Sequence, residues 1–239
     1  MTAKPAPGTL YGLGIGPGDP DLITLKALKI LQSVPVIAYP APENGSSLAR
    51  AIAQPHLTGG QTEIAIRTPM TPGTFPAHDV YDRYAGEIAA HLAEGRDVAV
   101  LCEGDPFLYG SFMYVFQRLS DGHRVEVVPG VSSLGAVAAV AGVPLVSRNQ
   151  VLTILPAPLD EAELEKRLKQ TEAAAIMKVG RHLEKVKRVL SRLGLEAGAK
   201  YVEHATMADE KVAPLADVTE ATAPYFSMIL VRRPEDVEK

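Results

Sequence analysis

The chain has 239 residues, of which 46% are hydrophobic and 22% charged, so it is long enough for one large or two smaller globular domains. Its net charge of −4 argues against nucleic-acid binding, and its single cysteine excludes an intrachain disulfide and indicates a reducing compartment. The sequence shows no secretory signal and no apolar run of about 18 residues, so we expect a cytoplasmic protein without a membrane segment.

Short apolar runs alternate with amphipathic runs, which is typical of an α/β protein with a largely parallel sheet. The predicted strands span residues 9–15, 36–39, 62–66, 97–102, 125–128, 151–155, 173–178, 200–203 and 225–231. The predicted helices span residues 21–32, 48–53, 80–93, 132–140, 160–170 and 181–193, and a further helix ends at Leu119. The polar segment 120–123 predicts a boundary between domains of residues 1–121 and 122–239, and residues 1–8 read as a disordered tail.

A glycine-rich segment joins the first predicted strand to the first predicted helix; it reads Gly12-Leu13-Gly14-Ile15-Gly16-Pro17-Gly18-Asp19. Glycine lets a backbone approach a ligand closely, and a helix start presents free N–H groups. The dinucleotide pattern G-x-G-x-x-G fails, because its third glycine falls on Pro17 or on Asp19 in the two registers. The segment therefore indicates either a ligand-binding turn or a purely structural one.

Two more segments follow predicted strands at their carboxyl ends, where parallel α/β sheets bind ligands. In Glu103-Gly104-Asp105-Pro106, two carboxylates can accept hydrogen bonds from an amine or a ribose. The alternative is that Asp105 caps the next helix, with Pro106 at its first position. In Val128-Pro129-Gly130-Val131-Ser132-Ser133, two hydroxyls can cap a helix or donate to a ligand.

Other common sites are missing from the sequence. The six histidines form no H-E-x-x-H motif, and one cysteine cannot make a cysteine-rich zinc site, so no metal is expected. The hydrolase pattern G-x-S-x-G does not occur either. A Pro/Gly-rich loop predicted over residues 67–79 is long for a compact domain, which is typical of a lid or a binding loop.

Taken in order, the three segments resemble the signatures of the tetrapyrrole methylase family. Residues 14–20, 103–107 and 128–133 match the first, second and third signature, and the resemblance runs from about Thr9 to Arg232. Within the family, residues 102–111 and 148–157 are similar to the branch that methylates precorrin-2 at C-20. Glu103 stands where the uroporphyrinogen methyltransferases usually have a glycine.

The resemblance implies two α/β domains, with S-adenosyl-L-methionine in a cleft between them, and a homodimer. It places the first segment near the tetrapyrrole, so Gly14 and Gly16 become substrate-binding candidates. The cofactor contacts carried over position by position are Pro17, Glu103, Gly104, Asp105, Leu108, Ser132, Ser133, Met177, Lys178, Ala205 and Thr206. The last four depart from the family's frequent Met-Gly and Asn-Gly-Thr, which makes their alignment less direct.

The implied reaction converts precorrin-2 and S-adenosyl-L-methionine into precorrin-3A and S-adenosyl-L-homocysteine in cobalamin biosynthesis. Methyl transfer from a sulfonium requires alignment and exclusion of water rather than a triad or a metal. A proton must also leave the methylated carbon, and Glu103, Tyr109 and Tyr39 are the candidate acceptors.

The many carboxylates of this substrate require a local rim of positive side chains, because a net charge of −4 cannot attract them. Arg67 and Arg148 are the predicted rim, since a guanidinium can bind a carboxylate through two parallel hydrogen bonds. Three alternatives stay open: the same methylation of cobalt-factor II in the anaerobic route, another branch such as diphthine synthase or an RNA methylase, and a non-catalytic module that binds adenosylmethionine.

Overall fold

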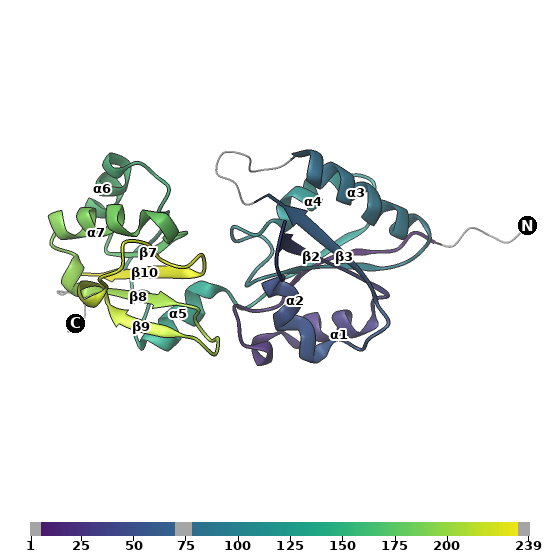
Figure 1. The fold of residues 1–239 in the computed structure, drawn as a ribbon, viewed down its shortest axis with the longest axis horizontal. Helices are drawn as coiled ribbons and strands as arrows, with labels where there is room; N and C mark the ends of the chain where they lie inside the picture. Colours follow the sequence, from purple (N-terminus) through teal and green to yellow (C-terminus); the bar gives the residue numbers. More distant parts are fainter. Residues whose placement is uncertain (1–5, 70–77, 234–239) are drawn as a thin grey trace, which may run out of the picture. The chain divides into compact units, whose positions relative to one another are not determined.

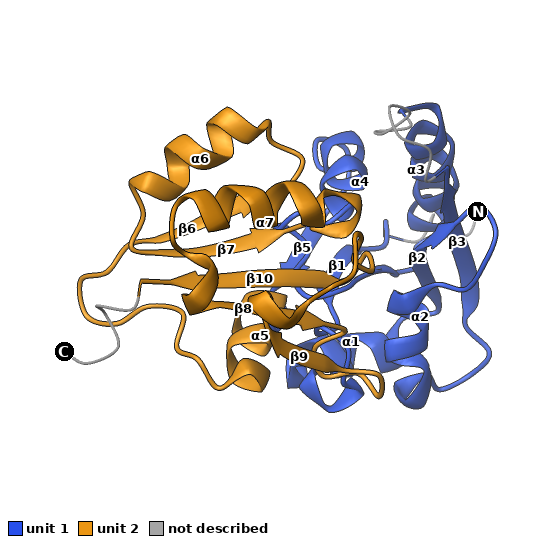
Figure 2. Ribbon diagram, turned by 60° about the vertical axis from the view of Figure 1, so that its left-hand side comes forward, with its two compact units in different colours: residues 1–132 blue, residues 133–239 orange. Residues whose placement is uncertain are grey.

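A computed structural model describes residues 6–69 and 78–233, which form two compact α/β units divided between Ser132 and Ser133 (Figures 1 and 2). The first unit contains β1 (Leu10–Gly14), α1 (Leu25–Ser33), β2 (Val36–Pro42), α2 (Leu48–Ala53), β3 (Thr62–Thr68), α3 (His78–Ala93), β4 (Val98–Cys102), α4 (Phe112–Leu119) and β5 (Val125–Val128). The second contains α5 (Ser133–Ala141), β6 (Leu152–Pro156), α6 (Glu161–Lys169), β7 (Ala173–Met177), α7 (Leu183–Arg192), β8 (Ala199–Glu203), β9 (Lys211–Pro214) and β10 (Ser227–Arg232). The predicted α/β class is confirmed.

The first sheet is entirely parallel, with strand order β3-β2-β4-β1-β5. β4 lies in its centre and is buried at every position, as expected for an unbroken apolar strand that is covered on both faces. α3 and α4 pack on one face through Tyr81 and Phe112, while α1 and α2 pack on the other through Leu31 and Ile52. This arrangement brings the carboxyl ends of all five strands to one edge.

The second sheet is mixed, with strand order β6-β7-β10-β8-β9. β6 and β7 pair in parallel, whereas β10 runs antiparallel to both of its neighbours and β8 runs antiparallel to β9. The sequence did not predict β9 or the antiparallel pairs. They arise because no crossover helix separates β8, β9 and β10, and a parallel pair needs such a crossover.

Helices cover both faces of the second sheet (Figure 2). α6 and α7 contribute Leu164 and Val189 to the core on one face. α5 is built from small residues, and its Ala136 and Val137 pack on the other face against Ala205 and Met228. The short side chains of α5 let it lie close to the strand ends.

The first unit extends further along the chain than the predicted boundary after Asp121. β5 pairs in parallel with β1, so the segment after residue 121 continues the first sheet up to Ser132. Of the predicted tail, residues 1–5 lie outside the described residues, and Gly8 is held by a 2.8 Å hydrogen bond from its N–H to the Leu92 carbonyl.

Hydrogen bonds, local in one case and between strands in the other, shift two element boundaries. Asp19 caps a 3₁₀ turn (Pro20–Leu22), and Thr24 then caps α1, so the helix begins four residues later than predicted. β3 continues to Thr68, which places Arg67 in a strand rather than in the predicted loop. Residues 70–77 of that loop lie outside the described residues.

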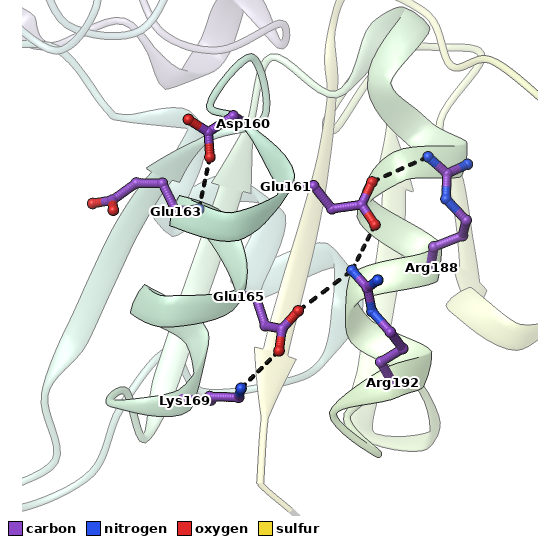
Figure 3. A network of polar contacts seen from close by, with 7 residues as sticks. All are labelled: Asp160, Glu161, Glu163, Glu165, Lys169, Arg188 and Arg192. Atoms are coloured by element: carbon purple, nitrogen blue, oxygen red, sulfur yellow. Dashed lines mark hydrogen bonds and ion pairs between the residues drawn. The ribbon is translucent and has the colours of Figure 1, made fainter.

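Exposed charged side chains connect α6 to α7 (Figure 3). Glu161 accepts from Arg188 at 3.3 Å and from Arg192 at 2.5 Å, and Arg192 lies 3.4 Å from Glu165. Hydrogen bonds from Arg188 and Arg192 lower the pKa of Glu161. Because water and salt screen exposed pairs, the buried residues beneath them dominate the stability of this helix pair.

We expect Leu164→Ala to lower the free energy of unfolding by about 2–5 kcal/mol, because it removes a fully buried side chain and leaves a cavity. Arg192→Ala should cost much less, and its effect should shrink further in high salt. Urea unfolding of both variants at two salt concentrations measures this. If Arg192→Ala lowered the free energy of unfolding as much as Leu164→Ala and did so at both salt concentrations, the buried residues would not dominate the stability of this helix pair.

Candidate functional site

The three glycine-containing segments meet at one edge of the first sheet. They follow β1, β4 and β5, which are neighbours in the order β4-β1-β5 and run parallel. Gly104 N–H donates to the Gly16 carbonyl at 2.8 Å, and Ile15 N–H donates to the Cys102 carbonyl at 3.0 Å. The predicted substrate residues Gly14 and Gly16 therefore lie directly beside the predicted cofactor residues Gly104 and Asp105.

No side chain fits where these turns cross. A Cβ on Gly130 would lie 1.9 Å from the Gly104 carbonyl oxygen. A Cβ on Gly14 would lie 2.4 Å from the Gly130 nitrogen and 2.7 Å from the same oxygen. The glycines are thus required for the close approach of three backbones, and they leave backbone groups rather than side chains at the crossing.

Asp105 connects the second segment to the third. Its Oδ1 accepts from Phe107 N–H at 2.9 Å and its Oδ2 accepts from Gly130 N–H at 3.1 Å. α4 begins only at Phe112, so Asp105 is not the cap of that helix, which was one of the two interpretations of the sequence. Its carboxylate instead positions the turn after β5 against the turn after β4.

Glu103 is the half-buried carboxylate of the site. Its Oε1 accepts from Ala49 N–H, in the first turn of α2, at 3.1 Å. Burial raises the pKa of Glu103, and the backbone hydrogen bonds oppose this only in part. A carboxylate whose pKa is moved toward neutrality is a better proton acceptor at physiological pH.

The two tyrosine candidates have different environments. Tyr109 is exposed and has a φ of +56°, a conformation that is uncommon outside glycine. Tyr39 is buried, and its hydroxyl donates to Glu63 Oε2 at 2.7 Å. Burial and Glu63 raise the pKa of Tyr39, which disfavours its phenolate form.

Sequence reasoning missed the partners of Tyr39. Arg50 holds Glu63 through both carboxylate oxygens, with Nε donating at 2.8 Å and Nη2 at 2.9 Å. Nothing in the spacing of residues 39, 50 and 63 signals this cluster, because it depends on the pairing of β2 with β3 and on the packing of α2.

The remaining candidates of the first unit surround the crossing. Pro17 is buried in the turn after β1. Leu108 follows Asp105 and donates its N–H to the Asp105 carbonyl at 3.4 Å. Ser132 ends the first unit, and Ser133 is the first residue of α5.

The candidates of the second unit also share one edge of their sheet. Met177 ends β7 and the Ala205–Thr206 pair follows β8, and both strands flank β10 with Met228 opposite Met177. Two strand spacings, about 10 Å, therefore separate the two segments. Lys178, His204 and Thr206 have φ values of +58°, +46° and +67°, and such strained residues cluster at functional sites.

The two predicted arginines occupy different places. Arg67 lies near the carboxyl end of β3, at the edge of the first sheet that carries the three segments. Arg148 is exposed in the loop before β6, which Arg232 and Gln150 hold near the amino end of β7. Within the second unit, Arg148 is thus at the opposite edge from Met177 and Thr206.

No cluster of three or more potential metal ligands occurs among residues 6–69 and 78–233. Within the same residues, no helix is both long and apolar enough to cross a membrane.

Fold and site together define an α/β protein whose candidate ligand-binding segments lie at strand ends of its two sheets. The family model described as "Tetrapyrrole (Corrin/Porphyrin) Methylases" matches residues 9–219, and the chain belongs to this family. Among solved structures, a cobalt precorrin-4 methyltransferase has a TM-score of 0.73 at 27% identity, covering 94% of both chains. The uroporphyrin-III C-methyl transferase of Thermus thermophilus, complexed with S-adenosyl homocysteine, has a TM-score of 0.67 at 25% identity, covering 93% of this chain and 97% of that one.

Similar sequences point to one branch of the family. The precorrin-2 C(20)-methyltransferase of Sinorhizobium sp is 44% identical, over 94% of this chain and 95% of that protein. The cobalt-precorrin-2 C(20)-methyltransferase of Salmonella typhimurium is 34% identical, over 95% and 97%. The cobalamin biosynthesis protein CobIJ of Mycobacterium tuberculosis is 42% identical over 95% of this chain, which spans about half of that longer relative (46%).

We expect Gly130→Ala to destabilise the first unit by about 1–3 kcal/mol, because the added methyl group overlaps the Gly104 carbonyl and forces the turns apart. Gly135→Ala is the matched control, since its Cβ meets nothing within 4 Å and alanine favours the helix. Thermal unfolding of both variants measures the difference. Equal melting temperatures would show that the crossing tolerates a side chain.

Glu103→Gln should raise the melting temperature at pH 7–8. The raised pKa of Glu103 means that the folded protein disfavours its charged form, so charge at this position costs stability above the unfolded pKa. The gain should fade as the pH falls through the raised native pKa toward 4.5, the ordinary value of a glutamate, because the native carboxyl takes up its proton first. Glu87→Gln on the exposed face of α3 is the control. A lower melting temperature for Glu103→Gln at neutral pH would instead mark the carboxylate as a stabilising group.

Proposed function

We propose that the chain transfers a methyl group from S-adenosyl-L-methionine to C-20 of precorrin-2, giving precorrin-3A and S-adenosyl-L-homocysteine in cobalamin biosynthesis. The observation that carries the proposal is the meeting of the three segments at the β4-β1-β5 edge. The 44% identity to a precorrin-2 C(20)-methyltransferase over nearly the full length of both chains favours this branch.

The cofactor would supply an activated methyl group on a positively charged sulfur. The donor set at this edge fits such a group, because the carboxylates of Glu103 and Asp105 lie at the end of β4 and can attract a positively charged ligand. The residues proposed to bind it are Pro17, Glu103, Gly104, Asp105, Leu108 and Ser132 of the first unit and Ser133, Met177, Lys178, Ala205 and Thr206 of the second.

The chain's own part in the reaction is to align, to exclude water and to accept a proton. When C-20 gains the methyl group, it must lose the proton that it carried, and we propose Glu103 as the acceptor. Its raised pKa suits this role, and Ala49 N–H fixes one of its oxygens. Tyr39 is the weaker candidate because its hydroxyl already donates to Glu63. Tyr109, which is exposed, would line the substrate side.

The same methylation of cobalt-factor II is the second candidate function, supported by the 34% identity to the Salmonella typhimurium cobalt-precorrin-2 enzyme. The higher identity to the metal-free branch places it second. We also propose a cytoplasmic homodimer that binds neither nucleic acid nor a membrane, consistent with the net charge of −4.

Anaerobic incubation with S-adenosyl-L-methionine and either metal-free precorrin-2 or its cobalt form tests the proposal by mass spectrometry. We expect one added methyl group on the metal-free substrate, formed in step with S-adenosyl-L-homocysteine. Glu103→Gln should turn over at least about tenfold more slowly even when S-adenosyl-L-methionine is saturating. Methylation of the cobalt form alone would favour the second function, and cofactor binding without turnover of either substrate would leave a binding module.

A further inference from the structure

An open pocket of about 370 Å³ lies within the first unit, at the carboxyl ends of β2 and β3. Its lining includes Tyr39, Ser46, Ser47, Arg50, Ala51 and Arg67. Two arginines, two serines and one tyrosine therefore line this space, and no carboxylate is among its described lining residues. In a chain with a net charge of −4, this is a local concentration of hydrogen-bond donors and positive charge.

Arg50 forms a fixed wall of the pocket. Its Nε and Nη2 donate to the two oxygens of Glu63, and its Nη1 donates to Gln54. The Glu63 carboxylate balances its charge and raises the pKa of Arg50. Arg50 is thus held in place by groups of the protein itself and adds little net charge to the pocket.

Arg67 differs from Arg50 in its hydrogen-bond partners, which are backbone carbonyls rather than a carboxylate. Its Nη1 donates to the carbonyls of Pro42, Glu43 and Gly45, at 2.9, 3.3 and 3.5 Å. These bonds orient the side chain, but carbonyls do not neutralise its charge. All its hydrogen bonds to the described residues use Nη1, so the edge formed by Nε and Nη2 has no partner within that part of the chain. This is the edge with which arginine binds a carboxylate through two parallel bonds.

The pocket adjoins the proposed proton acceptor. Ala49 N–H donates to Glu103, while the next two residues of α2, Arg50 and Ala51, line the pocket. Successive Cα atoms lie about 3.8 Å apart, so the residue that contacts Glu103 and the residues that line the pocket lie within one turn of α2. The pocket and Glu103 thus contact neighbouring residues of the same helix.

We propose that this pocket binds one carboxylate side chain of the tetrapyrrole, with Arg67 as the anchor, and so sets which part of the macrocycle is presented to Glu103. The proposal rests on the proposed function for the class of substrate. Arg67 supplies the charge and the two N–H groups, Arg50 and Tyr39 form the rigid wall, and the exposed Ser46 supplies a hydroxyl donor.

Steady-state kinetics with precorrin-2 provide the first test. Arg67→Ala should raise the KM for the tetrapyrrole about tenfold or more, leave kcat within about threefold and leave the Kd for S-adenosyl-L-methionine unchanged. Arg67→Lys keeps the charge but loses the fork, so its KM should lie between those of Arg67→Ala and the wild type. Arg124→Ala, which removes one exposed charge before β5 at the other edge of the sheet, is the control and should match the wild type.

A charge test avoids disturbing the loop that Arg67 holds. Ala51 is exposed on α2, so Ala51→Glu places a carboxylate in the pocket lining, and Ala51→Gln adds a neutral side chain of the same size. Binding of uroporphyrin, a stable fluorescent tetrapyrrole with eight carboxylates, can be followed by its emission without turnover. Ala51→Glu should weaken binding several-fold, with a smaller effect at high salt, and Ala51→Gln should not.

The outcomes separate the pocket from the proposed function. If the wild type methylates precorrin-2 while Arg67→Ala and Ala51→Glu keep wild-type KM and uroporphyrin affinity, the pocket proposal is overturned and the function stands. If the wild type binds uroporphyrin through the pocket but methylates neither precorrin-2 nor its cobalt form, the proposed function fails instead. Equal weakening by Ala51→Glu and Ala51→Gln, without a salt effect, would show occupancy without charge recognition and would overturn the role of Arg67 as the carboxylate anchor.

Discussion

The contact between Gly104 and Gly130 is the constraint on which the candidate site depends. Two turns that follow different strands approach so closely that a single methyl group cannot be inserted, and Gly14 completes the crossing from a third strand. Asp105 strengthens the contact by accepting the Gly130 N–H. Because the turns are fixed in this way, Glu103 projects from a rigid base, and the site needs no side chain at its centre to stay in place.

The candidate segments at the strand ends of the two sheets have different backbone conformations. The first uses glycine where its turns meet, whereas the second places Lys178, His204 and Thr206 in the left-handed region at the ends of β7 and β8. Left-handed backbone costs energy for a β-branched residue such as Thr206, and the surrounding contacts must compensate. Glu210, which accepts the Thr206 N–H at 2.7 Å, is one of these contacts.

Local patterns predicted most of the fold, and long-range pairing explains what they missed. Helix α2 and strand β5 have the predicted bounds, because their apolar positions and flanking residues are decisive within a few residues. The boundary at residue 121 failed to include β5 in the first unit, since only its pairing with β1 reveals where it belongs. For the same reason, the three segments could be identified one by one, but not the partnership of Asp105 with Gly130 or of Tyr39 with Glu63. Arg148 belongs to a loop whose location depends on long-range contacts, and Arg232 holds that loop near the amino end of β7 through Gln150.

The position of β10 has a consequence for how the chain is made. This strand lies in the centre of the second sheet but follows every other strand in the sequence. The ribosome therefore releases all strands of the first unit early, and that unit can fold while synthesis continues. The edges of β7 and β8 that pair with β10 stay unpaired until residues 227–232 are synthesised. Unpaired strand edges favour association with other chains. The nascent protein is thus most vulnerable to aggregation in the interval between the synthesis of β9 and that of β10.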